Sequence, residues 1–295
     1  MERIVNRVLS VKLAQGHVNT VTRFSAEAGP GNRFVVFLQG CNFNCISCHH
    51  PDRINGCNSC GKCVEPCPEM ALYFDGHHRV VVDDDECTKC GICTQVCPSD
   101  STPLSQMVRL DSLTRQISEV AHFVSGVTVS GGEPTLQSDF VTSLFCALKC
   151  DDKLSNLTTF VESNGHAGRL VWDRLLPVMD GAIVTLRALD PDTHIEITGE
   201  TNVRVLDSIR YLAEWDRLWE VRLLVIPGKN DDPAEMERTA GWLHNVDPRM
   251  RIKLVGFTNP GVRSQFAALP SASREQIAGL GEIIRGVGFR ELVIA

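Results

Sequence analysis

Cys41, Cys45 and Cys48 form the pattern CxxxCxxC within the run CNFNCISC. Thiolates at this spacing can bind one iron–sulfur cluster, and the neighbouring sequence offers no fourth ligand. A [4Fe-4S] cluster held by three thiolates has one iron without a protein ligand, where a small molecule can bind. The apolar run 34–38 predicts a strand just before Cys41. The cysteines are therefore expected on a loop after a strand, where α/β barrels carry their catalytic groups.

Eight further cysteines form two copies of one pattern, thirty residues apart. The copies are Cys57, Cys60, Cys63 and Cys67 before Pro68, and Cys87, Cys90, Cys93 and Cys97 before Pro98. This pattern matches the run of bacterial two-cluster ferredoxins, in which the fourth cysteine of each run binds the other cluster. One [4Fe-4S] cluster would then bind to Cys57, Cys60, Cys63 and Cys97, and the other to Cys87, Cys90, Cys93 and Cys67. Structural zinc sites are the alternative, but they do not explain four cysteines per copy, each ending in Cys-Pro.

The composition indicates a cytoplasmic protein without a membrane or nucleic-acid partner. Of the 295 residues 43% are hydrophobic, no apolar run approaches a bilayer span, and the N-terminus lacks a secretory signal. Thirteen cysteines in the reducing cytoplasm are not expected to form disulfides. The formal net charge of -7, without a basic stripe, argues against binding of a phosphate backbone.

From residue 111 onward, strand and helix patterns alternate along the chain. Strands are predicted at 126–130, 157–162, 182–187, 220–226 and 251–257, each followed by a helical segment. With the strand at 34–38 they make six βα units, which predicts parallel strands joined by helices. We expect an α/β fold, a partial (β/α)6 TIM-like barrel that stays open. A flat doubly wound sheet is the alternative.

The composition also divides the chain into three segments. Residues 1–50 hold an N-terminal extension, the first barrel strand and the cysteine loop, with no role assigned to residues 1–17. Residues 51–103, rich in Cys, Pro, Gly and Asp, are predicted to be an inserted ferredoxin-like domain with two [4Fe-4S] clusters. Residues 104–295 complete the barrel. Further strands are predicted at 18–24 and 291–294, and a helix over 111–124 with Asp111 as its N-cap.

The region around the first cysteines resembles a known family. Gly29-Pro30-Gly31-Asn32-Arg33, the run VVFLQGC that ends at Cys41, and the CxxxCxxC are similar to the signature of the glycyl-radical-enzyme activating enzymes of the radical S-adenosylmethionine (SAM) superfamily. The resemblance extends from about residue 18 to the C-terminus and is closest to the YjjW-type activases, which carry a two-cluster insert. It implies a radical SAM barrel whose [4Fe-4S] cluster reductively cleaves SAM. The 5′-deoxyadenosyl radical then takes a hydrogen atom from a glycine of a partner glycyl radical enzyme, with flavodoxin or ferredoxin as electron donor.

The same resemblance implies a set of SAM contacts near the strand ends. Gly131, Gly132 and Glu133 match the GGE motif that binds the SAM amino group, and Arg187 would pair with its carboxylate. The remaining implied contacts are Ser47, Cys48, His49, Ser163, Asn164, Thr185, Leu186, Arg222 and Thr258. Taken alone, the Gly-Gly-Glu and Asn164-Gly165 sequences are also typical of ordinary turns.

Several positions depart from the family pattern. Glu162 and Thr185 replace aspartates that supply cation-binding oxygens in some relatives, and Ala28 replaces another aspartate. Ser47 stands where an aromatic residue often packs on the adenine, and Thr258 where a histidine is common. Arg187 replaces a lysine, and its planar fork differs from lysine in reach and geometry. None of these changes removes an iron ligand, so an active enzyme with weaker SAM binding is expected.

Two other functions remain open from the residues. One is a radical SAM enzyme that acts on another peptide or a small molecule. The second is a non-catalytic electron-transfer protein of the polyferredoxin type, which would explain residues 51–103 but leave the CxxxCxxC and the βα region without a role.

Overall fold

A computed structural model of the protein describes residues 14–295, which form a mixed α/β fold around one nine-stranded sheet. The strands of this sheet are β1 (Gln15–Ser25), β2 (Arg33–Leu38), β5 (Gln106–Arg109), β6 (Gly126–Gly131), β7 (Thr158–Ser163), β8 (Gly181–Leu186), β9 (Leu218–Val225), β10 (Ile252–Gly256) and β11 (Leu292–Ile294). The main helices are α3 (Leu110–Val120), α4 (Ser138–Cys150), α5 (Arg169–Leu175), α6 (Pro191–Thr198), α7 (Val203–Glu214), α8 (Pro233–Val246) and α9 (Arg274–Val287).

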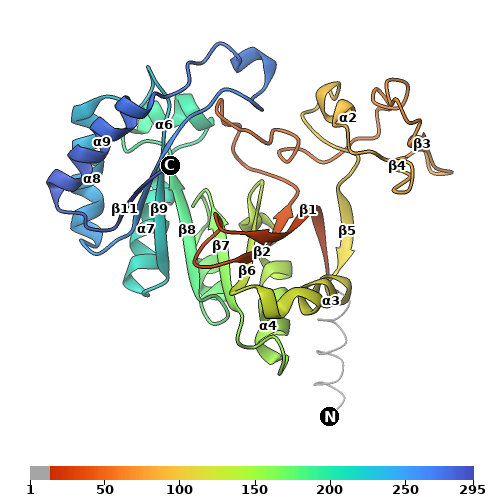
Figure 1. The fold of residues 1–295 in the computed structure, drawn as a ribbon, viewed down its shortest axis with the longest axis horizontal. Helices are drawn as coiled ribbons and strands as arrows, with labels where there is room; N and C mark the ends of the chain where they lie inside the picture. Colours follow the sequence, from red (N-terminus) through yellow and green to blue (C-terminus); the bar gives the residue numbers. More distant parts are fainter. Residues whose placement is uncertain (1–13) are drawn as a thin grey trace.

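The sheet is largely parallel, as the alternation of strands and helices predicts. Its order is β11-β10-β9-β8-β7-β6-β2-β1-β5 (Figure 1). The six strands from β2 to β10 in this order pair in parallel, and each lies within two residues of its predicted range. In the described chain β11 and β5 are the two edges, so the sheet is open rather than closed on itself.

Antiparallel strands extend the sheet beyond β2. β1 pairs with β2, and β5, which follows residues 51–103, pairs with the first residues of β1. Strands were predicted at 18–24 and 291–294, and β1 and β11 confirm both.

Helix α3 buries an apolar stripe made of Leu110, Leu113, Ile117 and Val120. Their spacing of three and four residues places them on one helical face, which packs into the main core. The predicted helix at 111–124 is confirmed, but its predicted N-cap is wrong, because the N-cap is Arg109. Asp111 lies inside the first turn, where its carboxylate accepts hydrogen bonds from the Arg109 side chain.

Residues 51–103 form a lobe at one side of the sheet with little regular structure (Figure 1). The lobe contains a two-stranded sheet of β3 (Leu72–Phe74) and β4 (Val80–Val82) and the four-residue helix α2 (Ile92–Gln95). Its two ends meet in an isolated antiparallel bridge between Arg53 and Ser101. The chain thus leaves the main body and returns to it at the same place.

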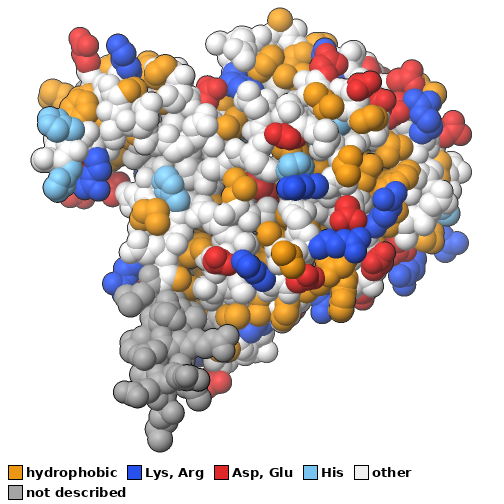
Figure 2. All heavy atoms as spheres, turned by 180° about the vertical axis from the view of Figure 1, so that it is seen from behind, with side chains coloured by type: hydrophobic (Ala, Val, Ile, Leu, Met, Phe, Trp, Pro, Cys, Tyr) orange, Lys and Arg blue, Asp and Glu red, His pale blue; other side chains and the backbone are white. Residues whose placement is uncertain are grey.

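Residues 1–13, part of the segment 1–17 to which no role was assigned, lie outside the described residues, while residues 15–17 belong to β1. Within residues 14–295, no helix has the length and apolar character needed to cross a membrane. On the face in Figure 2, acidic and basic side chains are interspersed.

Candidate functional site

A cavity of about 440 Å³ lies where the carboxyl ends of the parallel strands meet. The residues predicted for the site that line this cavity are Cys41, Cys45, Ser47, Cys48, His49, Gly131, Gly132, Asn164, Thr185, Arg187 and Arg222. They come from the loop after β2, from the ends of β6, β7 and β8, and from β9. Parallel strands place their carboxyl ends at one edge, which explains why residues so distant in the sequence share one cavity.

The cysteine loop, residues 41–48, is anchored to the end of a distant helix. The N–H groups of Asn44 and Ile46 donate to the carbonyls of Thr198 and Ile197 at the end of α6, both at 2.9 Å. These bonds take the place of the regular pairing that the chain loses when it leaves β2. The loop is therefore anchored to α6 on both sides of Cys45.

The thiols of this loop are mostly withdrawn from water. Burial raises the pKa of Cys41 to about 12 and also raises that of Cys48, where Arg187 and Arg263 oppose the effect. Iron binding requires the thiolate, so cluster assembly must release these protons. No three His, Cys, Asp or Glu side chains within residues 14–295 converge as around one metal ion. A four-iron cluster needs no such convergence, because each thiolate binds a different iron atom.

Ser47 supplies an independent sign of a ligand. Its hydroxyl is buried beside the cavity and has no hydrogen-bond partner among the described residues. A buried hydroxyl without a partner is unfavourable, and a ligand in the cavity would give it one. The three thiols, this hydroxyl and the Arg187 guanidinium together fit a three-thiolate cluster that carries a small polar molecule.

Gly131 and Gly132 allow the end of β6 to lie directly against the cysteine loop. A Cβ on Gly131, which has φ +130°, would stand 2.2 Å from Leu38 N, and a Cβ on Gly132 would stand 2.2 Å from Gly40 O. The N–H groups of Gly132 and Glu133 already donate to the carbonyls of Leu38 and Gly40 (3.0 and 2.7 Å). Both glycines are therefore required by backbone packing, and a ligand here would meet carbonyl groups rather than these two N–H groups.

Glu133 lies behind the cavity wall, where it is fully buried. Its carboxylate accepts hydrogen bonds from Thr135 N–H and Oγ1 (2.9 and 2.5 Å), from Ser163 Oγ (2.9 Å) and from Asn164 N–H (2.7 Å). Burial raises the pKa of Glu133, and these donors act in the opposite direction. Glu133 and Ser163 thus tie the end of β6 to the end of β7 and hold Asn164 at the cavity.

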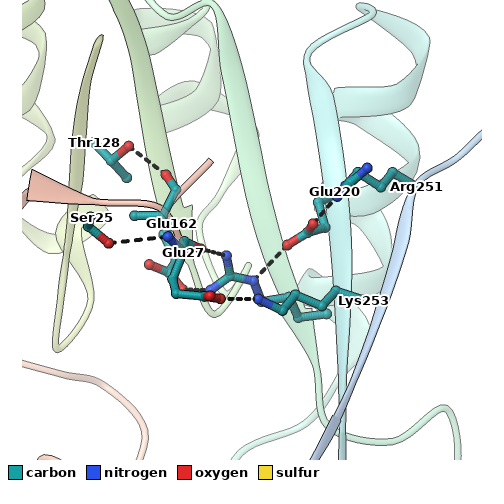
Figure 3. Close-up of polar contacts among 9 residues, drawn as sticks. Ser25, Glu27, Thr128, Glu162, Glu220, Arg251 and Lys253 are labelled. Atoms are coloured by element: carbon teal, nitrogen blue, oxygen red, sulfur yellow. Dashed lines mark hydrogen bonds and ion pairs between the residues drawn. The ribbon is translucent and has the colours of Figure 1, made fainter. Parts of the chain in front are cut away.

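Arg222 on β9 lines the cavity with its donors already bound to protein. It pairs with Glu162 on β7 and with Glu220 (2.8 Å), and it donates to the carbonyl of Glu27 in the β1–β2 loop. The carboxylate of Glu27 in turn pairs with Lys253 on β10 (Figure 3). Glu162, which stands where relatives have aspartate, is therefore neutralised by an arginine of the chain itself.

Four predicted contacts do not line this cavity: Glu133 and Ser163, described above, and Leu186 and Thr258. Leu186 is buried in the main core. The carbonyl of Thr258 accepts a hydrogen bond from His49 Nε2 at 2.7 Å, and the His49 ring stacks on Phe257 with 5.7 Å between centroids. The loop after β10 therefore contacts His49, the residue that follows the cysteine loop.

Arg53 is a cavity residue that was not predicted from the sequence. Its side chain is buried, with the guanidinium 4.1 Å from the centroid of the Phe37 ring and Nε bonded to Asn19 (3.3 Å). It lines the same cavity as Thr185 and Arg187. A single arginine after the cysteines carries no recognisable spacing, so only the fold identifies it.

Arg33 of the Gly-Pro-Gly-x-Arg signature has a structural position. It is fully buried, stacks over Phe160 at 4.5 Å, and donates to Thr128 Oγ1 (3.0 Å) and Val127 O (2.9 Å). Burial lowers its pKa to about 10, so it stays protonated at neutral pH. It fixes the loop before β2 against β6 and β7.

In the lobe, the two four-cysteine runs are interleaved. One small cavity is lined by Cys67 of the first run together with Cys87, Cys90 and Cys93 of the second. Ser59 and Lys89, at matching positions of the two repeats, both have φ 57°. The two copies thus have the same turn conformation, and none of the thirteen cysteines, all of which lie within residues 14–295, forms a disulfide.

Comparisons with known proteins agree with this geometry. Residues 35–240 match the model of the radical SAM superfamily. The (2S)-3-sulfopropanediol dehydratase activating enzyme of Klebsiella oxytoca is 31% identical over 78% of this chain and 77% of that protein. The benzylsuccinate synthase activating enzyme of Thauera aromatica is 29% identical over 90% of this chain and 85% of that protein. The fold also resembles that of QueE from Escherichia coli, with a TM-score of 0.52, 14% identity and 97% of each chain covered. The chain belongs to the radical SAM superfamily and, within it, to the glycyl-radical-enzyme activating enzymes.

Proposed function

We propose that this protein generates a glycyl radical on a partner glycyl radical enzyme, with a [4Fe-4S] cluster on Cys41, Cys45 and Cys48 and with SAM as cosubstrate. The observation that carries this function is one cavity lined by those three thiols, by Arg187 and by the partnerless Ser47 hydroxyl. The relatives named above are activating enzymes of a dehydratase and of a synthase, which supports the same class of reaction.

When bound, the cluster and SAM supply one-electron cleavage of the sulfonium and a radical able to take a hydrogen atom from a glycine Cα. The chain's own residues bind and orient. We assign Arg187 to the SAM carboxylate, through its two-pronged fork, and the carbonyls of Gly131 and Gly132 to the amino group. Asn164, Thr185 and the backbone at Ser47, Cys48 and His49 complete the cavity wall, while Arg222 and Glu133 hold that wall in place.

The partner glycine must enter from the open side. Six parallel strands with helical connections support a partial (β/α)6 barrel, whose described edges β5 and β11 do not pair with each other. An open edge gives a polypeptide segment access that a closed barrel would deny. We propose that residues 1–50 and 104–295 form this barrel, apart from the N-terminal extension.

We further assign two [4Fe-4S] clusters to residues 51–103, a ferredoxin-like domain that receives electrons from flavodoxin or ferredoxin. The cavity shared by Cys67, Cys87, Cys90 and Cys93 supports the crossed ligand sets, with Cys57, Cys60, Cys63 and Cys97 as the other set. Because a reducing cytoplasm keeps thiols from forming disulfides, eleven cysteines that bind clusters are consistent with a cytoplasmic location.

The test is anaerobic incubation of the reconstituted protein with SAM, a reductant and a candidate glycyl radical enzyme. We expect 5′-deoxyadenosine, methionine and the electron paramagnetic resonance (EPR) signal of a glycyl radical on the partner. If 5′-deoxyadenosine forms and no tested partner gains a radical, the reaction on another peptide or small molecule is favoured. If no 5′-deoxyadenosine forms, the non-catalytic electron-transfer function replaces this one.

The relay function of the lobe needs its own test. Cys60→Ser and Cys90→Ser each remove one ligand from one proposed lobe cluster. With flavodoxin as donor we expect a large loss of turnover, and with a chemical reductant a much smaller one. Equal losses with both donors would indicate a structural role for the lobe.

A further inference from the structure

Arg263, in the loop after β10, joins three parts of the molecule that are far apart in the sequence. Its guanidinium Nη1 donates to Asn44 Oδ1 at 2.5 Å, and Nη2 donates to the carbonyls of Asn44 and Cys45 at 3.0 and 2.9 Å. It also forms an ion pair with Asp100, at the end of the lobe, at 3.4 Å. The cysteine loop, the lobe and the β10–α9 connection thus meet at one side chain.

The position of Arg263 is well defined by its surroundings. The side chain is only 9% exposed, and its guanidinium lies 5.0 Å from the centroid of the Phe266 ring. Nη2 binds the two consecutive carbonyls while Nη1 binds the Asn44 side chain, so the planar guanidinium restrains two adjacent peptide groups and one side chain together. A lysine ammonium lacks this planar arrangement of two nitrogens. The two peptide groups held here lie on either side of Cys45.

Asp100 is a suitable partner on the lobe side. It has φ +46°, a left-handed conformation that is uncommon for a residue other than glycine. It precedes Ser101, which bridges to Arg53 at the other end of the lobe, and the Ser101 hydroxyl also donates to Asn55 O at 2.7 Å. The Arg263–Asp100 pair therefore acts on the base of the lobe, where both of its ends are joined.

We propose that Arg263 is a positioning residue that fixes the cysteine loop, stabilises negative charge at the three-thiolate centre and connects that centre to the base of the lobe. This inference rests on the proposed function, since it assumes a cluster on Cys41, Cys45 and Cys48. A cation held against the loop favours the more negative, reduced form of the cluster. Asp100 has the opposite charge and partly offsets this effect.

Because Arg263 and Asp100 carry opposite charges, their removal should shift the midpoint potential of the cluster in opposite directions. In the reconstituted full-length protein, the cluster signal that changes on addition of SAM is followed by EPR during a redox titration. Arg263→Met should shift its midpoint to more negative potential and lower the reduced fraction several-fold at the wild-type midpoint. Asp100→Asn should shift the midpoint in the positive direction.

Two further variants separate charge from geometry. Arg263→Lys keeps the charge and loses the fork, so we expect a midpoint near that of the wild type with a changed EPR line shape. Arg285→Met removes an exposed arginine of α9 that pairs with Glu282 and should leave both midpoint and line shape unchanged. Should Arg263→Met fail to bind iron, the lysine and Asp100→Asn variants still carry the test.

The proposal is overturned if Arg263→Met, or the lysine and Asp100→Asn pair in its place, matches the wild type in midpoint and line shape. That failure differs from a failure of the proposed function. In the first case the wild-type protein still cleaves SAM to 5′-deoxyadenosine, whereas in the second it does not.

Discussion

The cysteine loop and the lobe hold their thiols in different ways. Loop 41–48 carries three cysteines and is fixed by α6, by Arg263 and by the strand ends around the cavity. The lobe carries eight cysteines, and two of the four buried residues of its apolar core, Cys63 and Cys93, are predicted cluster ligands. The cysteine loop is thus fixed by contacts outside its thiols, whereas half of the buried core of the lobe consists of predicted ligands.

The cysteine loop and the lobe also differ in backbone conformation. Of the six described non-glycine residues with positive φ, five lie in the lobe: Ser59, Met70, His78, Lys89 and Asp100. Such conformations persist only where the surroundings impose them. The β3–β4 turn imposes that of His78 through hydrogen bonds of Asp75, and the clusters proposed for the lobe would constrain the turns at Ser59 and Lys89.

The largest expected effect comes from the barrel site. Cys45→Ser removes one of three ligands that no other cysteine of the loop can replace. SAM cleavage should fall by more than about 100-fold, beyond the loss typical of an outer-shell partner. The rate of 5′-deoxyadenosine formation with a chemical reductant measures this loss. Cys150→Ser, which removes an exposed thiol at the end of α4, is the control. Retained activity and iron content in Cys45→Ser would contradict the assignment of this site.

Removal of iron should affect the stability of the two regions differently. After treatment with a chelator, amides of the lobe should exchange hydrogen almost as fast as those of an unfolded chain, because metal-binding energy is folding energy there. Strands β6 to β8 should keep their protection, because their core is apolar. Hydrogen exchange followed by mass spectrometry compares both in one sample. Equal protection of the lobe with and without iron would show that it folds on its own.

A smaller effect is expected behind the cavity wall. Glu133→Gln leaves one acceptor oxygen for four donors, so at least one donor loses its partner. Each buried donor left unpaired costs roughly 1–3 kcal/mol, and we expect a destabilisation in or above that range. Denaturant unfolding measures the change in the free energy of unfolding. Glu237→Gln, at an exposed position of α8, is the control. If both variants unfold at the wild-type midpoint, the carboxylate does not support the wall.

The smallest effect is expected where the cavity borders solvent. The Glu27 side chain is 78% exposed, although its partner Lys253 is only 13% exposed. Exposed ion pairs contribute little, so Glu27→Gln should change the free energy of unfolding by less than about 1 kcal/mol. The difference should shrink further at high salt. A larger loss of unfolding free energy that persists at high salt would mean that the Glu27–Lys253 pair is more than a surface contact.

The order of secondary structure could be predicted because its causes are local. Apolar runs and helical periodicity predict the six parallel strands to within two residues, and the repeated cysteine spacing marks the lobe. The predicted N-cap of α3, Asp111, is two residues from the observed one, Arg109. Residue type favoured Asp111, but the cap is the residue at which the backbone changes from extended to helical.

The sequence by itself determined the cysteine groups, the alternation of strands and helices, and the strand ends that carry polar residues. Ligand spacing and hydrophobic periodicity act over a few residues, so both can be read along the chain. Only the tertiary structure decided which of those residues face the cavity: it places Glu133 behind the wall, brings Arg53 into the cavity, and sets Arg263 against Asn44 across 219 positions. Such contacts depend on sheet order and loop path, which no local pattern specifies.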